Sequence, residues 1–218
     1  MRKQSAAMWT AGALAGVLLL GACGGGGGDE DKGDGAKGEI AGADKAAKSA
    51  SPSASSDKIK RPEIKLASDA KNVFEKTETG DPAKDAVLAD NQRRVNSIDQ
   101  VITRNKNLDA MKFYAKDSLL LENMKYAKGY LDEGISWAGK TRFYAQKVEL
   151  TGKNTATVSY CIDESKSRTK VRKTGKLKPN NGGDKNYVHD TVQLERNKQG
   201  VWQGANGESE PGGKKCPH

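Results

Sequence analysis

The sequence has few of the residues from which metal sites and many catalytic sites are built. Among its 218 residues there are two histidines, His189 and His218, and three cysteines, with no Cys-x-x-Cys pair. These side chains are poor material for a zinc-type site. The sequence also contains no glycine-rich phosphate loop and no serine-nucleophile elbow. We therefore expect neither a metal ion nor a cofactor.

The chain also has no apolar run long enough for a comfortable membrane span. Its longest run, Ala6–Leu20, has about fifteen residues, against the ~20 that a spanning helix needs. Two basic residues precede this run, which is the pattern of a signal peptide. The next residues, Leu20-Gly21-Ala22-Cys23, resemble the lipobox of bacterial lipoproteins. The resemblance implies a signal peptide over 1–22, a diacylglycerol anchor on Cys23 and a place on the extracytoplasmic face of the cell membrane.

The odd number of cysteines fits this interpretation. If lipid occupies Cys23, then Cys161 and Cys216 remain as an even pair in an oxidising compartment. We expect a disulfide between them, the alternative being two free thiols. The bond would close a loop of about 55 residues, for which the chain-entropy model gives roughly 4 kcal/mol.

Large apolar residues are sparse in 24–80, which Gly, Ala, Ser, Lys and Asp dominate. Such a composition buries too little surface to offset chain entropy, so we expect a disordered linker over 23–80. Within it, 64–74 either packs at an edge of the domain or does not. Residues 81–218 have 25 basic and 17 acidic side chains, a net charge of +8. For an exported domain this favours anionic lipids or cell-wall polymers as partners, and not nucleic acid.

The folded domain is predicted over 81–218, beginning with helices. Asp81 is a suitable N-cap and Pro82 suits the first helical position. Apolar residues then recur at helical spacing, with Asn91 interrupting the stripe. A second helical region starts near Leu108, breaks near 117–118 and stops at Gly134.

After the helices the apolar period changes to two. Residues 137–163 predict two strands joined through 151–154, and 186–210 predict two more joined through 197–200. Residues 164–186 are interpreted as a long, mobile connection. Helices followed by hairpins predict an α+β domain in which N-terminal helices pack on an antiparallel sheet.

This order of elements, together with "ATVSYCIDESKS" (156–167), "KTGK" (173–176), Trp202 and a terminal cysteine, resembles a known fold. It is the cone-shaped fold of nuclear transport factor 2-like proteins, which include ketosteroid isomerases and SnoaL-like polyketide cyclases. The chain also resembles actinobacterial exported lipoproteins of unknown function. The resemblance implies a curved antiparallel sheet around a pocket, and fold alone implies no function.

One pair of residues could carry chemistry. Asp190 alternates with Val188 and Val192 and therefore faces the apolar side of its strand, where burial could raise its pKa. Tyr160 faces the same side of a neighbouring strand, so an Asp–Tyr acid/base pair is conceivable. The alternative is that Asp190 lies at the rim, solvated or bonded to a basic side chain. His189 faces the opposite side, so no Asp–His pair shares a face, which weighs against an enzyme.

Two further groups complete the candidates. Aromatic residues could line the mouth of a pocket or belong to the core: Tyr114, Tyr130, Trp137 and Phe143. The segment 166–178 holds seven basic residues and no acid, and is either an anion-docking patch or a solvated loop: Lys166, Arg168, Lys170, Arg172, Lys173, Lys176 and Lys178.

The sequence thus favours a lipid-anchored, non-catalytic module of the cell envelope that binds a ligand, such as a small apolar molecule, or serves a structural role. One alternative is an isomerase- or cyclase-type enzyme that uses Asp190 and Tyr160. A second is adhesion to anionic envelope polymers through 166–178. The sheet could also pair two copies into a homodimer.

Overall fold

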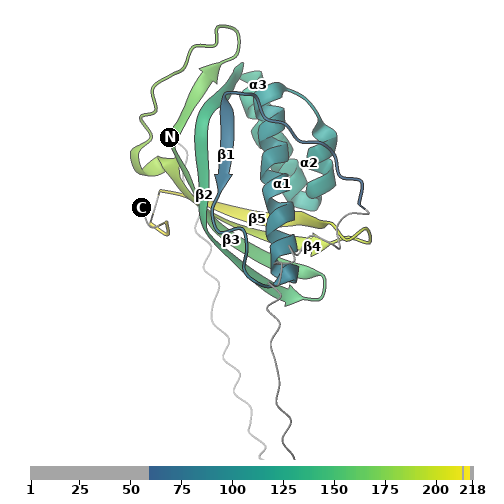
Figure 1. The fold of residues 1–218 in the computed structure, drawn as a ribbon. Coiled ribbons are helices and arrows are strands. Elements are labelled where there is room, and N and C mark those ends of the chain that lie inside the picture. The colour runs from purple at the N-terminus through teal and green to yellow at the C-terminus, as the bar shows by residue number, and fades with distance from the viewer. Residues whose placement is uncertain (1–58, 213, 217–218) are drawn as a thin grey trace, which may run out of the picture. The chain divides into compact units, whose positions relative to one another are not determined.

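The computed structural model describes residues 59–212 and 214–216 (Figure 1). The predicted signal peptide, Cys23 and linker residues 24–58 lie outside this range. The described chain is α+β, as expected, with three α-helices and a five-stranded sheet. No helix in this part of the chain is long and apolar enough to cross a membrane.

The helices are α1 (Pro82–Arg104), α2 (Leu108–Tyr114) and α3 (Asp117–Asp132). The expected N-cap is confirmed, because the Asp81 carboxylate accepts hydrogen bonds from the backbone N–H groups of Ala83 and Lys84. Helical structure also stops where expected, since Gly134 takes a left-handed φ of 64° that a side chain would disfavour.

The sheet contains β1 (Ala70–Phe74), β2 (Ile135–Gly152), β3 (Thr155–Val171), β4 (Tyr187–Arg196) and β5 (Trp202–Pro211), in that spatial order. The strands from β2 to β5 are antiparallel to their neighbours, whereas β1 runs parallel to β2. The expectation of a wholly antiparallel sheet is therefore wrong at one edge. A parallel pair needs a long crossover connection, which the helices between β1 and β2 supply.

The second part of the predicted linker belongs to the folded domain. Besides β1, the segment before it lies along α1: Arg61 forms an ion pair of 2.6 Å with the buried Asp90. The Ala67 backbone N–H donates to Thr103 Oγ1 at 3.2 Å. The polar composition of this segment concealed its role, because hydrogen bonds to buried polar groups of α1 add to the contacts of its few apolar side chains.

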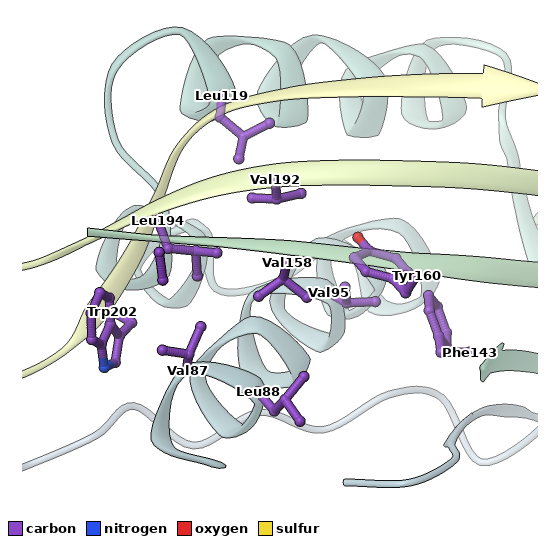
Figure 2. Close-up of a cluster of buried hydrophobic side chains, with 11 residues drawn as sticks. Val87, Leu88, Val95, Leu119, Phe143, Val158, Tyr160, Val192, Leu194 and Trp202 are labelled. Atoms are coloured by element: carbon purple, nitrogen blue, oxygen red, sulfur yellow. The ribbon is translucent and has the colours of Figure 1, made fainter. Parts of the chain in front are cut away.

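A buried apolar cluster joins α1 to the sheet (Figure 2). Val87, Leu88 and Val95 come from α1, and Leu119 comes from α3. The cluster's members from the strands include Phe143, Val158, Tyr160, Val192, Leu194 and Trp202. The even-numbered residues of β3 and β4 face this cluster, as the period-two pattern predicts.

The predicted long connection over 164–186 is wrong in its first part. β3 continues to Val171, because 166–171 pair with 135–140 of β2. A short turn follows, and the Asn180 side chain then fastens the chain by donating to the backbone oxygens of Glu164 and Ser167, both at 2.9 Å. Only part of the basic segment 166–178 is therefore loop.

The predicted disulfide between Cys161 and Cys216 is present. Cys161 lies on the face of β3 opposite to Tyr160, where Tyr144 and Tyr187 pack around it. The bond therefore fixes the C-terminal segment against the sheet face that points away from the helices.

Candidate ligand cavity

A cavity of about 820 Å³ opens between the helices and the sheet. Arg94, Val95, Ile98 and Asp99 of α1 line one side of it. Five α3 side chains line it as well: Leu119, Glu122, Asn123, Tyr126 and Tyr130. The sheet supplies, among others, Trp137, Phe143, Tyr160, Ile162, Glu164 and Asp190, and 179–181 lie at the rim. Its size is typical of a small-molecule site.

A chain of hydrogen bonds crosses the floor of this cavity. Arg94 Nη2 donates to the Tyr160 hydroxyl at 2.9 Å, and that hydroxyl donates to Asp190 Oδ2 at 3.0 Å. The other oxygen of Asp190 accepts from Ser209 Oγ at 2.7 Å. Burial, together with the neighbouring Asp190 carboxylate, raises the pKa of Tyr160 strongly. Tyr160 therefore stays a neutral hydrogen-bond donor at physiological pH.

Asp99 is the centre of a second set of hydrogen bonds, nearer the C-terminal end of α1 than Arg94. Its oxygens accept hydrogen bonds from Trp137 Nε1 at 3.0 Å and from Asn72 Nδ2 at 2.6 Å. Burial nevertheless raises the pKa of Asp99 to about 6, because these neutral donors offset only part of the lost hydration. Two donors thus hold the Asp99 carboxylate in place. Because its pKa is about 6, Asp99 takes up a proton at a higher pH than an exposed aspartate does.

Glu164 extends the inward face of β3 beyond Tyr160 and Ile162. Burial raises the pKa of Glu164 to about 7, and repulsion by Asp99, Asp190 and Asp163 adds to the effect. In contrast to Asp99, its carboxylate has no hydrogen-bond donor or ion-pair partner among the described residues. A carboxyl group that is poised near neutral pH and unpartnered within a cavity is a marker of a functional site.

Two tyrosines of α3 lie beside these acids. The hydroxyls of Tyr126 and Tyr130 are 3.3 Å apart, and their rings meet edge to face with centroids 5.3 Å apart. Charge on Asp99 and Glu164 raises the pKa of Tyr130, after the larger effect of burial. Tyr126 is 53% exposed and so lies at the opening. Aromatic rings and carboxyl groups therefore share one part of the cavity.

The acidic side chains are not arranged for a metal ion. Within residues 59–212 and 214–216, no three His, Cys, Asp or Glu side chains form a cluster that could hold one. The cavity is also much larger than an ion requires. What the arrangement offers is hydrogen bonding, proton transfer and electrostatic attraction for an organic molecule.

Most of the residues proposed from the sequence as a pocket lie around this cavity. Tyr130, Trp137, Phe143, Tyr160 and Asp190 line it. Tyr114 does not, because it is fully buried, in edge-to-face contact with Phe113, 4.9 Å between ring centroids. His189 pairs in register with Cys161 and so belongs to the opposite sheet face.

The seven basic side chains of 166–178 do not form one exposed patch, because three of them have other contacts. Lys170 forms an ion pair of 2.6 Å with Asp69, and Arg172 donates to the backbone oxygen of Ile135 at 2.9 Å. Arg168 lies at the cavity lining. The remaining four lysines are exposed: Lys166, Lys173, Lys176 and Lys178.

Sequence reasoning missed Arg94, Asp99 and Glu164. A signal existed for each. Arg94 and Asp99 flank the apolar positions Val95 and Ile98 on α1, so they border its buried stripe. Glu164 continues the period-two pattern of Tyr160 and Ile162, but the predicted strand ended one residue too early.

The fold and site together define a class: an α+β domain with an internal cavity lined by aromatic and acidic residues. No protein-family model matches the chain, and no curated protein sequence matches it. Among solved structures, the intermembrane space region of the chloroplast protein ARC6 is similar at 8% identity, covering 57% of this chain and 92% of that one, with a TM-score of 0.40.

Two other solved structures show similarity of the same order. A ketosteroid isomerase-like protein from Erwinia carotovora atroseptica has 14% identity over 59% of this chain and 95% of its own, with a TM-score of 0.40. The association domain of C. elegans CaMKII has 12% identity over 60% and 99%, with a TM-score of 0.37. We draw neither a family nor an activity from these similarities.

Proposed function

We propose that this protein is a lipid-anchored module of the cell envelope whose α+β domain binds a small organic molecule in its cavity. The observation that carries the proposal is the cavity itself, about 820 Å³ in volume and lined by carboxyl groups whose pKa values burial has raised. Folding such groups into an interior opposes stability, so their placement is better explained by a ligand than by packing.

The anchor and the compartment rest on the sequence. The lipobox-like Leu20–Cys23 supports a lipid on Cys23, and the disulfide between Cys161 and Cys216 suits an oxidising compartment. The order of helices and antiparallel strands supports membership of the nuclear transport factor 2-like group. Together these features favour a tethered domain that captures its ligand outside the cytoplasm.

The test is native mass spectrometry of the full chain carrying Cys23→Ala, produced in an oxidising compartment. We expect a mass that is lost on denaturation, and we expect Ile162→Trp to abolish it by filling the cavity. Thr157→Trp, on the opposite face of the same strand, is the control and should retain the adduct. An adduct that survives in Ile162→Trp would place the ligand elsewhere and contradict the proposal.

An isomerase- or cyclase-type enzyme is the second candidate. It is favoured by the pKa values of Asp99 and Glu164, about 6 and about 7, which suit a general base near neutral pH. Asp190, the candidate base named from the sequence, accepts hydrogen bonds from two hydroxyl groups. Exchange of substrate protons with deuterated solvent in the wild type, lost in Glu164→Gln, would establish catalysis.

Adhesion to anionic polymers is a third candidate, carried by the four exposed lysines of 166–178. Because solvent-exposed attraction is screened by salt, binding to such a polymer should weaken as ionic strength rises. Replacing Lys166, Lys173, Lys176 and Lys178 by glutamine should abolish it, and unchanged binding would refute adhesion through this segment.

A further inference from the structure

The charge of the cavity is opposite to that of the chain. The sequence has a net charge of +9, yet the cavity lining includes five acidic and two basic side chains. The acids are Asp99, Glu122, Glu164, Asp190 and Glu208, and the bases are Arg94 and Arg168. Arg94 keeps its positive charge, because its partners Asn91 Oδ1 at 3.0 Å and Tyr160 at 2.9 Å are neutral, and that charge lowers the pKa of Asp99, but the acids outnumber the two arginines. The cavity therefore has an excess of negative charge.

Two acids that pack within the fold are neutralised by arginines, whereas the acids of the cavity form no such pair. Asp90, only 1% exposed, forms ion pairs with Arg61 at 2.6 Å and Arg93 at 2.9 Å. Asp163 pairs with Arg142 at 3.2 Å. None of the five cavity acids forms an ion pair with a described residue. Asp90 and Asp163 are held by arginines within the fold, whereas Glu164 lines the cavity with no such partner and is free to meet a ligand's positive charge.

The walls beside the unpaired acids are aromatic. Trp137 donates its indole N–H to Asp99. Tyr126 and Tyr130 lie close enough to Asp99 and Glu164 that, after the larger effect of burial, the charge of these acids raises the pKa of both tyrosines. An aromatic face attracts a cation, and attraction strengthens where water is displaced. Carboxylates and aromatic rings around one space are complementary to an organic ammonium group.

An independent observation comes from α3. Asn123 lines the same cavity and is 8% exposed, and its Nδ2 has no hydrogen-bond acceptor among the described residues. A buried amide donor without an acceptor costs free energy unless a ligand supplies one. The wall of the cavity therefore contains a buried donor without an acceptor, beside the unpaired negative charge.

We infer that the ligand is a small organic cation, an ammonium group that carries a hydrogen-bond acceptor, held by Glu164 and Asp99 against Tyr126, Tyr130 and Trp137. This inference rests on the proposed function, because it specifies the class of molecule that the cavity takes. The positive charge of this ligand distinguishes it from the small apolar ligand expected from the sequence.

The test compares two probes of nearly equal shape, choline and 3,3-dimethylbutan-1-ol, which differ in whether the central atom is N⁺ or C. The full chain with Cys23→Ala is titrated with each probe at pH 8, and the NMR signal of the Trp137 indole N–H is followed. We expect choline to bind at least about tenfold more tightly than its neutral isostere.

Two variants distinguish binding at the cavity carboxylate from attraction to the overall charge of the protein. Glu164→Gln should weaken choline at least about tenfold and leave the isostere unchanged, whereas Glu149→Gln, which removes the same charge from an exposed position of β2, should change neither. Equal affinity for both probes, or choline binding that Glu164→Gln does not weaken, would overturn the inference. So would the absence of choline binding.

These outcomes are distinguishable from failure of the proposed function. A native mass adduct that Ile162→Trp removes, found together with equal affinity for the two probes, would keep the cavity as a ligand site and reject only the cation. An adduct that persists in Ile162→Trp would reject the cavity as the site.

Discussion

Replacing Glu164 by glutamine should stabilise this protein at alkaline pH, although a core-facing residue is being changed. The pKa of Glu164 is raised from an ordinary 4.5 to about 7 by burial and by repulsion from Asp99, Asp190 and Asp163. Between these two pH values the folded state holds a proton that the unfolded state has released. The free energy of unfolding therefore falls as pH rises from about 4.5 to about 7.

The size of the effect follows from the shift. A shift of one pKa unit corresponds to 1.36 kcal/mol, so full burial would give a loss of about 3 kcal/mol for Glu164. Because water in the cavity screens part of the charge, we expect about 1–3 kcal/mol. Glutamine carries no charge at any pH, so Glu164→Gln should match the wild type near pH 4 and exceed it by this amount at pH 8.

The assay is denaturant unfolding of the full chain with Cys23→Ala at pH 4 and pH 8. Asp99, with a pKa of about 6, adds a pH dependence of the same sign in every variant, so the difference between variants gives the contribution of Glu164 together with its repulsion of Asp99. Glu149→Gln is the control and should keep the pH dependence of the wild type. A Glu164→Gln variant that is no more stable than the wild type at pH 8 would refute the reasoning.

Four other outcomes can be checked. Cys23→Ala should move the protein from the membrane pellet to the soluble fraction, and retention in the pellet would show that the lipobox interpretation is wrong. Replacing Cys161 and Cys216 together by alanine should lower the free energy of unfolding by about 4 kcal/mol, measured by denaturant titration, and no loss would mean that the loop is not constrained in the unfolded chain. Tyr160→Phe should cost about 1–3 kcal/mol because the Arg94 guanidinium loses its acceptor, and a neutral effect would indicate that water replaces the hydroxyl. Choline affinity should rise from pH 5.5 to pH 8 as the cavity carboxyls ionise, which calorimetry would detect as proton release, and a flat profile would contradict their role.

The local elements were largely predictable, because short-range signals specify them. Asp81 and Pro82 define the start of α1, and Gly134 defines the stop after α3, through capping chemistry that involves only neighbouring residues. The alternation along β3 and β4 brought Tyr160 and Asp190 onto one face, and their side chains are indeed 3.0 Å apart. Cysteine counting gave the disulfide pair.

The edge of the sheet was not predictable from local signals. Residues 59–74 look like linker because they are polar, and only their pairing with β2 and with buried polar groups of α1 shows that they belong to the domain. Likewise, "ESKSRTKV" (164–171) has little apolar character. It forms a strand because 135–140 of β2 present a complementary edge, and such pairing depends on tertiary context.

The sequence by itself determined the α+β class, the disulfide pair and the inward face that holds Tyr160 and Asp190, since each depends on periodicity, capping or counting. Only the tertiary structure decided the site. Asp99 on α1 and Glu164 on β3 are 65 positions apart, and neither is recognisable as a candidate site residue until the fold brings both to one cavity, where neither forms an ion pair with a described residue. The pKa of a carboxyl group depends on its burial and on the charges and hydrogen-bond donors near it, and for Asp99 and Glu164 these are present only in the folded chain.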